Sequence, residues 1–416
     1  MKLRAYRAGI DYAEEMDTIT HGIAGALIGK AIFRGEDMFA PKAMNRARII
    51  TWSLMLGAIF PDCDVLRDFF SRDRLLIITW HRSITHSLVC LPIFALLLAA
   101  LSRRFARWRK WDDTPSLAAF AGIYVVGLLS HILLDLVTSF GTMIWSPLKW
   151  SRPAWDLVFI VDFTLTAILL LPQMVAWVYQ DPAHSKRRAL RMSLGFALAP
   201  VLIAGIGQMV GAPISARYVL AAIVLFTAIF LLPGLRGWGP GIAYDSWNRA
   251  GFAAGLAYIG LAMYAHHEAL LRIEKFAGQL HLEVQALGAL PLPPSLWRWD
   301  GLVRTPRGVY ELRMDLSDGI SSSKDPAAAP PIEHRYYPDA LPNAFIEAAE
   351  RLPEVQKVLW FARFPVTRFH KEGDEAIVEI LDLRFRREGS QRPPGFTYRV
   401  RFDRSARVIS KGWTNE

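Results

Sequence analysis

Most of the first 271 residues alternate between long apolar segments and short polar connections. A helix that crosses a lipid bilayer needs about 20 mostly apolar residues, and several of these segments reach that length. We predict a shorter apolar helix over 18–33, followed by spans near 49–64, 87–102, 117–136, 157–179, 192–212, 216–235 and 250–271. The pattern therefore predicts a polytopic α-helical membrane protein with seven or eight spans, in a domain covering residues 1–271.

The pattern changes after residue 271. Residues 272–295 are predicted to form a short helix and a linker, and residues 296–416 have the composition of a soluble domain. Apolar and polar residues alternate over 381–385 and over 396–402, which predicts half-buried strands. The stretch PNAFIEAAERLPEV predicts one short helix. We therefore expect a small C-terminal α+β domain.

The net charge of +10 is concentrated in the connections between the apolar segments. The basic residues concerned are Lys30, Arg34, Lys42, Arg46 and Arg48, then Arg103, Arg104, Arg107, Arg109 and Lys110, then Lys186, Arg187, Arg188 and Arg191, then Arg236 and Arg249. They occupy every second connection, so the positive-inside rule assigns these connections to the cytoplasm. The C-terminal domain then lies on the opposite side, the periplasmic side of a bacterial inner membrane. The expected partner is the lipid bilayer and not nucleic acid, because no basic run has the pattern of a nucleic-acid-binding module.

Ionisable residues recur where the predicted spans meet this outer side. They are His21, Asp62, Asp64, His81, Arg82, His86, His131, Asp135 and Asp162. Such groups are costly at the edge of the hydrocarbon region and usually face a partner or a cavity. Because they fall at one membrane depth, we expect them to form one site.

The spacing of these residues fits metal ligation. His131 and Asp135 are four positions apart, so both lie on one face of a helix. Asp62 and Asp64 lie on one side of the chain if that segment is extended. Imidazole nitrogen and carboxylate oxygen suit zinc, with manganese or iron as alternatives. We predict one or two divalent ions held by His131 and Asp135, by His81 or His86, and by an aspartate of the PDCD turn.

The remaining polar residues fit the hydrolysis of a phosphoester. The planar guanidinium of Arg82 suits a phosphate oxygen, and Asp64 or Asp162 is the candidate general base. Two metal ions would clamp an in-line displacement at phosphorus. Because the site lies at the depth of lipid headgroups, we expect a lipid or lipid-linked substrate.

Several stretches resemble a known family: MDTITHGIAGALIG, GAIFPDCDV, HRSITHS, SHILLDLVTSFGTMIWSPL and FIVDFTL. Over roughly residues 16–180, the chain resembles the YdjM-like family of bacterial inner-membrane proteins, for which metal-dependent hydrolase activity is inferred. The resemblance implies an integral membrane protein with a His/Asp metal site. Carried onto this sequence, the candidate ligands are His21, Asp62, Asp64, His81, His86, His131 and Asp135.

Two other functions fit the same residues. The cluster could be the structural polar core of a non-catalytic membrane scaffold or regulator, because histidines and aspartates at helix ends also serve as caps. Intramembrane His and Asp residues also build relays in metal and proton transporters. A cluster at one membrane edge, joined by short connections, favours a hydrolase over transport. Replacing His131 or Asp135 separates an enzyme, which should still fold, from a scaffold, which should lose stability.

Overall fold

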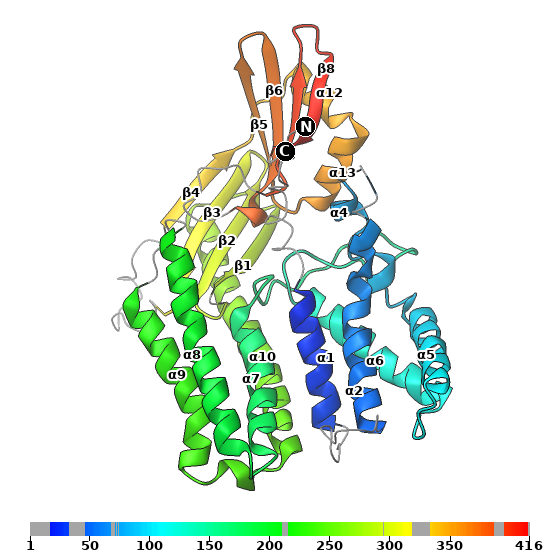
Figure 1. Ribbon diagram of the computed structural model, residues 1–416. Helices are drawn as coiled ribbons and strands as arrows, with labels where there is room; N and C mark the ends of the chain where they lie inside the picture. Colours follow the sequence, from blue (N-terminus) through cyan, green and yellow to red (C-terminus); the bar gives the residue numbers. More distant parts are fainter. Residues whose placement is uncertain are drawn as a thin grey trace, which may run out of the picture.

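A computed structural model of the chain describes residues 17–32, 46–67, 71, 73, 75–209, 215–293, 295–317, 333–386 and 395–414. The regular elements described before residue 280 are helices, and β-strands dominate after it. Figure 1 shows the long helices side by side, with the β-strands gathered at one end of them. The chain therefore has a helical part and a C-terminal β-sheet domain.

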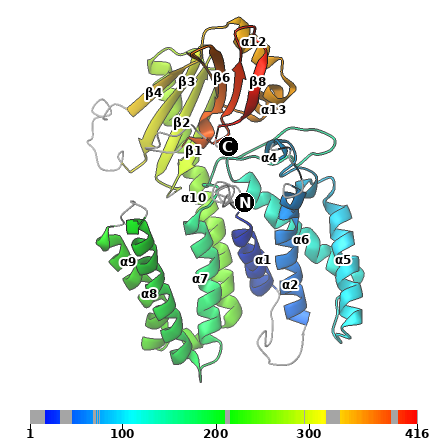
Figure 2. The same cartoon turned by 45° about the horizontal axis from the view of Figure 1, so that its top comes forward.

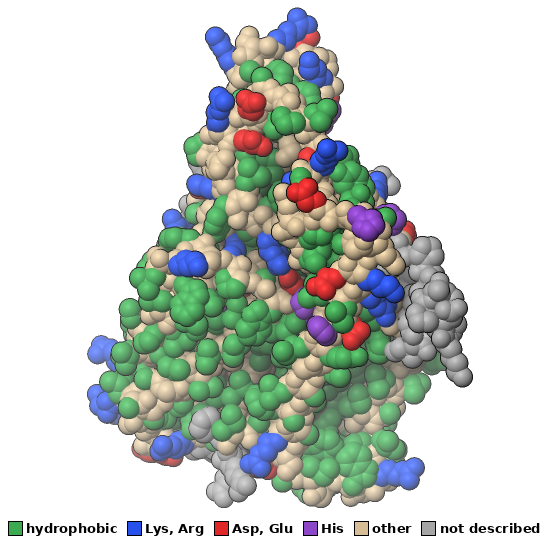
Figure 3. All heavy atoms as spheres, turned by 180° about the vertical axis from the view of Figure 1, so that it is seen from behind, with side chains coloured by type: hydrophobic (Ala, Val, Ile, Leu, Met, Phe, Trp, Pro, Cys, Tyr) green, Lys and Arg blue, Asp and Glu red, His purple; other side chains and the backbone are tan. Residues whose placement is uncertain are grey.

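The helices of the first part coincide with the predicted apolar segments. They are α1 (Thr18–Ile32), α2 (Arg46–Ile59), α5 (Leu91–Trp108), α6 (Leu117–Leu136), α7 (Phe163–Tyr179), α8 (Ser185–Met209), α9 (Ala216–Leu235) and α10 (Tyr244–Gln279). Figure 3 shows hydrophobic side chains over the outer face of these helices, with basic side chains at the end away from the β-strands. This surface is that of a membrane protein.

The prediction of seven or eight spans is not supported. Among the described residues, α6, α8 and α9 are long and apolar enough to cross a membrane, and a bent pair made of 76–86 and α5 is a fourth candidate. Helices α1 and α2 have only 15 and 14 residues. Helix α10 has 36 residues, but glycines, tyrosines and the pair His266 and His267 dilute its apolar stretch. Apolar composition predicted helices correctly and overestimated how many of them can span a bilayer.

Helices α1, α2 and α6 pack closely because glycines lie where they cross. A Cβ atom on Gly127 of α6 would lie 2.8 Å from the carbonyl oxygen of Leu54 and 3.1 Å from the Cα of Gly57, both in α2. A Cβ atom on Gly25 of α1 would also lie 2.8 Å from that carbonyl oxygen. Small residues at helix crossings permit such backbone approach in membrane proteins. The crossings fix α1 and α6 against the C-terminal half of α2.

Between α2 and α5 the chain leaves regular helix. Among the residues described there, three short elements follow one another: η3 (Phe60–Val65), α4 (Leu76–Thr79) and η4 (Ile84–His86). Pro61 stands at the start of η3, where its missing N–H ends the hydrogen bonding of α2. The connection between α6 and α7 supplies partners to this irregular backbone: the amide of Met143 donates to the carbonyl of Arg82 at 2.8 Å. Most of the predicted site residues lie in or beside this stretch.

The described part of the C-terminal domain contains two antiparallel four-stranded sheets. The first has the order β1 (Ala286–Leu292), β2 (Arg298–Thr305), β3 (Gly308–Asp315) and β4 (Glu333–Pro338), and the second the order β5 (Pro365–Glu372), β6 (Glu375–Asp382), β7 (Tyr398–Phe402) and β8 (Val408–Trp413). The last turns of α10 pack under the first sheet, where Ile273 and Ala269 share a core with Trp299 and Leu312. Helix α10 is thus continuous past residue 271 and joins the two parts of the molecule.

Two local predictions for this domain are corrected. The stretch predicted as one helix forms two, α12 (Ala344–Glu350) and α13 (Pro353–Phe361). Pro353 cannot donate to a preceding turn, and it forces Leu352 into extended backbone with ψ 132°. The strand predicted over 381–385 ends at Asp382, and η7 (Leu383–Phe385) follows it. The Asp382 carboxylate caps η7 by accepting from the amide of Arg384.

The β domain lies at the end of the helical part where α1 begins and α6 ends (Figure 2). The turns after α5 and α9, which carry Arg109 and Arg236, lie at the other end. Arg34 and Lys42 lie outside the described residues. The predicted site residues and the β domain therefore share one end of the molecule, opposite these basic turns.

Candidate metal centre

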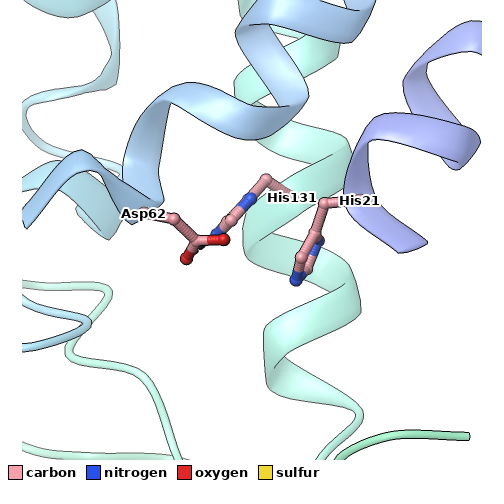
Figure 4. Close-up of side chains that lie close together, drawn as sticks. All are labelled: His21, Asp62 and His131. Carbon is pink, nitrogen blue, oxygen red and sulfur yellow. Dashed lines mark ion pairs between the residues drawn. The ribbon is translucent and has the colours of Figure 1, made fainter. Parts of the chain in front are cut away.

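Residues from four segments meet at the end of α6. His21 belongs to the first turns of α1, Asp62 to η3, His86 to η4, and His131 and Asp135 to α6. All five side chains are buried. Figure 4 shows His131 of α6 with Asp62 on one side and His21 of α1 on the other. The imidazole rings of His21 and His131 stack with their centroids 3.8 Å apart.

Four side chains turn one donor atom each toward one another. The Nε2 atom of His131 lies 3.0 Å from Nε2 of His86. It also lies 3.4 Å from Oδ1 of Asp62 and 3.3 Å from Oδ2 of Asp135. The Nε2 atom of His86 lies 3.6 Å and 3.1 Å from the same two oxygens. Ligands placed about 2.0–2.1 Å from a tetrahedral zinc ion are separated by about 3.3 Å, so the distances from the two Nε2 atoms to each other and to the two carboxylate oxygens are those of a metal-ligand set.

The other ring nitrogens are engaged as they are in metal sites. Nδ1 of His131 lies 2.6 Å from the backbone carbonyl of Ala58, which can only accept, so this nitrogen carries the proton. Nδ1 of His86 lies 3.0 Å from the hydroxyl of Thr85, which donates to Oδ2 of Asp64 at 3.1 Å. Outer partners of this kind fix the tautomer and leave Nε2 free to bind a metal. Two Nε2 lone pairs that face each other at 3.0 Å require a cation or a proton between them.

The net charge of the cluster also favours a bound cation. The buried carboxylates of Asp62, Asp64 and Asp135 all contact histidines, and the guanidinium of Arg82 pairs with Asp135. With neutral imidazoles, this group carries an excess of two negative charges. Burying uncompensated charge costs several kcal/mol per ion, on the order found for buried ion pairs. A divalent cation would balance the excess, and the donor set fits one; protons on the imidazoles are the alternative.

Arg82 and His21 meet the second oxygen of Asp135. The Arg82 Nη2 lies 3.0 Å from Oδ1 of Asp135, and the His21 Nε2 lies 3.3 Å from the same oxygen. The Arg82 Nη1 donates to the hydroxyl of Thr138 at 3.0 Å. Arg82 has a φ of 58°, a left-handed backbone that is costly for this residue type. The predicted phosphate-binding guanidinium is thus paired, and only its Nε has no hydrogen-bond partner among the described residues.

Asp64 and His81 are placed beside the four donors and not among them. Oδ1 of Asp64 lies 3.0 Å from Nδ1 of His81, and Oδ2 accepts from the amide of Arg82 and the hydroxyl of Thr85. His81 is buried, and its Nε2 has no hydrogen-bond partner among the described residues. In the described chain, the groups able to hold an ion consist of His21, Asp62 and His131, and of His86, His131 and Asp135. Asp64 therefore orients the segment 81–87.

Asp162, a predicted general base, caps a helix. Its Oδ1 accepts from the amides of Thr164 and Leu165 at the start of α7. Its Oδ2 accepts from the hydroxyls of Tyr258 at 2.7 Å and Ser295 at 2.5 Å. Both oxygens are thus engaged in holding α7, α10 and the linker together.

A small cavity of about 20 Å³ lies beside the cluster. Its walls include His21, Arg82, Asp135 and Thr138, together with the apolar segment 158–160. This volume is enough for about one water molecule. The cavity is therefore the place where water can stand next to Asp135 and Arg82.

Sequence reasoning missed the hydroxyl and backbone partners. Thr18 donates to Oδ2 of Asp62 at 2.5 Å, Thr138 accepts from Arg82, and the Ala58 carbonyl holds His131. Thr85 was visible as the residue before His86 in HRSITHS, but its relay to Asp64 depends on the folded backbone. A backbone carbonyl leaves no signal in the sequence.

The fold and the cluster define an α-helical membrane protein with a buried His/Asp site suited to a divalent metal and a C-terminal β-sheet domain. Residues 16–210 match the family described as YdjM inner membrane protein. The match confirms the resemblance and includes every residue of the cluster. The β domain lies outside the matched residues. No curated protein and no solved structure matches the chain.

Proposed function

We propose that the protein is a membrane-bound, metal-dependent hydrolase whose metal is held by Asp62, His86, His131 and Asp135. The observation that carries the proposal is the 3.0–3.6 Å that separates each histidine Nε2 from the other and from the carboxylate oxygens of Asp62 and Asp135. Both histidines keep only Nε2 free, which is the state a metal requires. Zinc suits this mixture of nitrogen and oxygen, and manganese and iron are the alternatives.

We infer a single ion. The two histidines offer one free nitrogen each, so they cannot serve two separate ions. The second oxygen of Asp135 is taken by Arg82 and His21, and the second oxygen of Asp62 accepts from Thr18. Arg82 thus provides the positive charge at the position on Asp135 where a second ion would bind.

The groups around the cavity support the proposal that the substrate is a phosphoester. A divalent ion held there would supply Lewis-acid chemistry and activate water. Arg82 lines the cavity, and among the described residues its Nε has no hydrogen-bond partner; a guanidinium suits phosphate oxygens. Its contact with Asp135 holds it beside the donor atoms, where negative charge develops as water attacks phosphorus.

The surroundings of the site favour a lipid or lipid-linked substrate. The connection between α6 and α7 exposes Trp145, Leu148, Trp150 and Trp155. Tryptophans of this kind lie at the level of lipid headgroups in membrane proteins. A cavity of about 20 Å³ does not hold a phosphate group, so we infer that its walls move apart when substrate enters.

The proposed location is a bacterial inner membrane that the chain crosses several times, with the site and the β domain on the periplasmic side. The support is the position of the basic turns at the end of the helical part opposite the β domain. The short helices α1 and α2 then lie within the protein, against α6 and α10, where lipid contact over a full membrane thickness is not needed.

The first test is elemental analysis of the protein purified in detergent. We expect about one equivalent of zinc or manganese in the wild type. The double variant His86→Ala, His131→Ala should lose it while remaining folded. The matched control is His184→Ala, because His184 also contacts an aspartate, Asp181, but on the exposed turn before α8. This control should retain the metal.

Metal content also separates the hydrolase from the scaffold. If the protein is a scaffold, protons occupy the position of the ion. The wild type should then hold no stoichiometric metal even after reconstitution, and variants of the cluster should lose thermal stability. For metal-loaded protein, we expect release of phosphate or of a phosphorylated headgroup from phosphatidic acid or phosphatidylglycerol vesicles. Metal without hydrolysis of any phosphoester presented in this way would contradict the enzymatic proposal and leave a structural metal site.

A further inference from the structure

One buried phenylalanine stands between the metal-site candidates and the β domain. Phe140 lies in the connection between α6 and α7 and is fully buried. Its ring centroid is 5.8 Å from the ring of His81, and the guanidinium of Arg82 lies 5.1 Å from the same ring. On its other side, the rings of Phe361 and Phe396 lie 5.4 Å and 6.0 Å away. Its side chain therefore contacts both parts of the molecule.

Arg152 also contacts both parts of the molecule, in this case through hydrogen bonds and ring contacts. Its Nη1 and Nη2 donate to the carbonyls of Ile78 and His81 at 2.7 Å and 2.5 Å, and its Nε donates to the carbonyl of Gly141. Its guanidinium also lies over the rings of Phe140 and Phe361 at 4.5 Å and 5.2 Å. Arg152 thus holds the backbone just before Arg82 while it packs against α13.

Two arginines of the β domain, Arg363 and Arg384, bind the chain segment between α6 and α7. The Nη1 and Nη2 atoms of Arg363 donate to the two carboxylate oxygens of Asp156, at 2.9 Å and 2.8 Å. Burial would lower the pKa of Arg363, but the hydrogen bonds and charge of Asp156 raise it overall. Arg384, fixed by Asp382, donates to the carbonyl of Ser139 at 3.0 Å.

The contact is also part of a hydrophobic core. Ile78 of α4 and Phe140 belong to the same buried cluster as Val358 and Phe361 of α13 and Val400 of β7. A shared core of this kind indicates a fixed interface between the two parts and not a passing contact, because undocking would expose it to water.

We propose that the C-terminal β domain positions Arg82, with Phe140 and Arg152 as the positioning residues that transmit its docking to the metal site. Arg82 adopts a left-handed backbone that the chain would not choose by itself. It is held there by the Met143 amide on its carbonyl and by the Arg152 contact with the preceding carbonyl. The part assigned to Arg82 rests on the proposed function, while the mechanical coupling does not.

The test breaks the docking pair on the β-domain side, far from the cluster. In Arg363→Asp, the new carboxylate faces Asp156, and the domain should lift from the connection. Hydrogen exchange of the full chain in detergent should then be at least about tenfold faster at the amides of Arg82 and Met143. Phenylglyoxal, which modifies accessible arginines, should label Arg82, which is 3% exposed in the docked protein.

A charge swap separates positioning from general damage. Asp156→Arg combined with Arg363→Asp should restore slow exchange and protect Arg82 again. The control is Arg399→Glu, which breaks a pair with Glu379 inside the second sheet, away from the interface. It should leave both readouts at their wild-type values.

Unchanged exchange and labelling at Arg82 in Arg363→Asp would overturn the proposal, as would a swap that behaves like the single variant. Neither readout involves a metal. A wild type that binds no metal would therefore contradict the proposed function only. Hydrogen exchange and labelling would still decide whether docking of the β domain positions Arg82. In metal-loaded protein, we also expect Arg363→Asp to bind zinc about tenfold more weakly, because outer contacts tune ligand sets by that order.

Discussion

Asp64 shows how a buried carboxylate can serve a site without contacting its centre. It accepts from the Arg82 amide and the Thr85 hydroxyl, and it lies 3.0 Å from the His81 ring. Through Thr85 it also sets the tautomer of His86. One side chain thereby fixes most of the polar contacts of the segment that carries the histidines.

Asp64→Asn should weaken metal binding without removing a ligand. The amide keeps the shape of the carboxylate but not its charge, so the proton on Nδ1 of His86 is held less firmly. We expect one equivalent of metal as in the wild type, with an affinity about 10–100-fold lower. Competition with a chelator measures it. Asp62→Asn, which changes a donor, should instead abolish stoichiometric binding. Equal loss of metal in both variants would show that Asp64 is itself a ligand.

The local backbone explains why the sequence did not separate Asp62 from Asp64. Their spacing of two positions puts both on one side only in an extended segment. The segment is a 3₁₀ helix, in which neighbours differ by about 120°, so residues two apart point in different directions. In contrast, the spacing of His131 and Asp135 lies within a regular helix, where the pattern determines the shared face.

At the scale of the helices, the site depends on how closely α2 and α6 approach. Gly127 meets the backbone of α2 at Leu54 and Gly57, one turn before His131 on the same helix. Ala58, whose carbonyl accepts from Nδ1 of His131, directly follows Gly57 in α2. Any separation of the two helices therefore pulls the ring and its acceptor apart.

Gly127→Ala should lower stability and disturb the site together. Its Cβ would stand 2.8 Å from the Leu54 carbonyl, so α2 must shift. Overpacking of this kind costs about 1–3 kcal/mol. The control is Gly122→Ala in the same helix, where a Cβ meets nothing within 4 Å and helix propensity favours alanine by about 1 kcal/mol. Thermal unfolding and metal content measure both variants. A Gly127→Ala protein as stable as Gly122→Ala, with full metal content, would show that this crossing does not position the site.

The apolar pattern located the helices but could not show which of them cross the membrane. Apolar segments located the helices because burial in protein and burial in lipid select the same residues. The pattern could not show that α1 packs against α2, α7 and α10, so that its 15 residues need not match a bilayer. The bend between 76–86 and α5 was equally hidden, since it comes from the fold of HRSITHS and not from a long polar break.

At the scale of the whole molecule, the interface between the helical part and the β domain was not predictable. The alternation at 396–402 showed strands with a buried face, but not that Phe396 packs on Phe140 more than 250 positions earlier. Arg363 and Asp156 are ordinary charged residues in the sequence, and only the fold shows that they meet. The C-terminal domain was expected, while its contact with the metal site was not.

The shared end of the cluster and the β domain leads to a prediction about membrane orientation. The basic turns lie at the opposite end, and positive residues are retained in the cytoplasm, so the cluster and the β domain should face the periplasm together. Alkaline phosphatase fused after Glu416 should therefore be active, and a green fluorescent protein fused there should not fluoresce. A fusion in the turn after α9, near Arg236, should show the reverse. Fluorescence from the C-terminal fusion would place the site in the cytoplasm, and a hydrolase acting on outer-leaflet lipids would then be excluded.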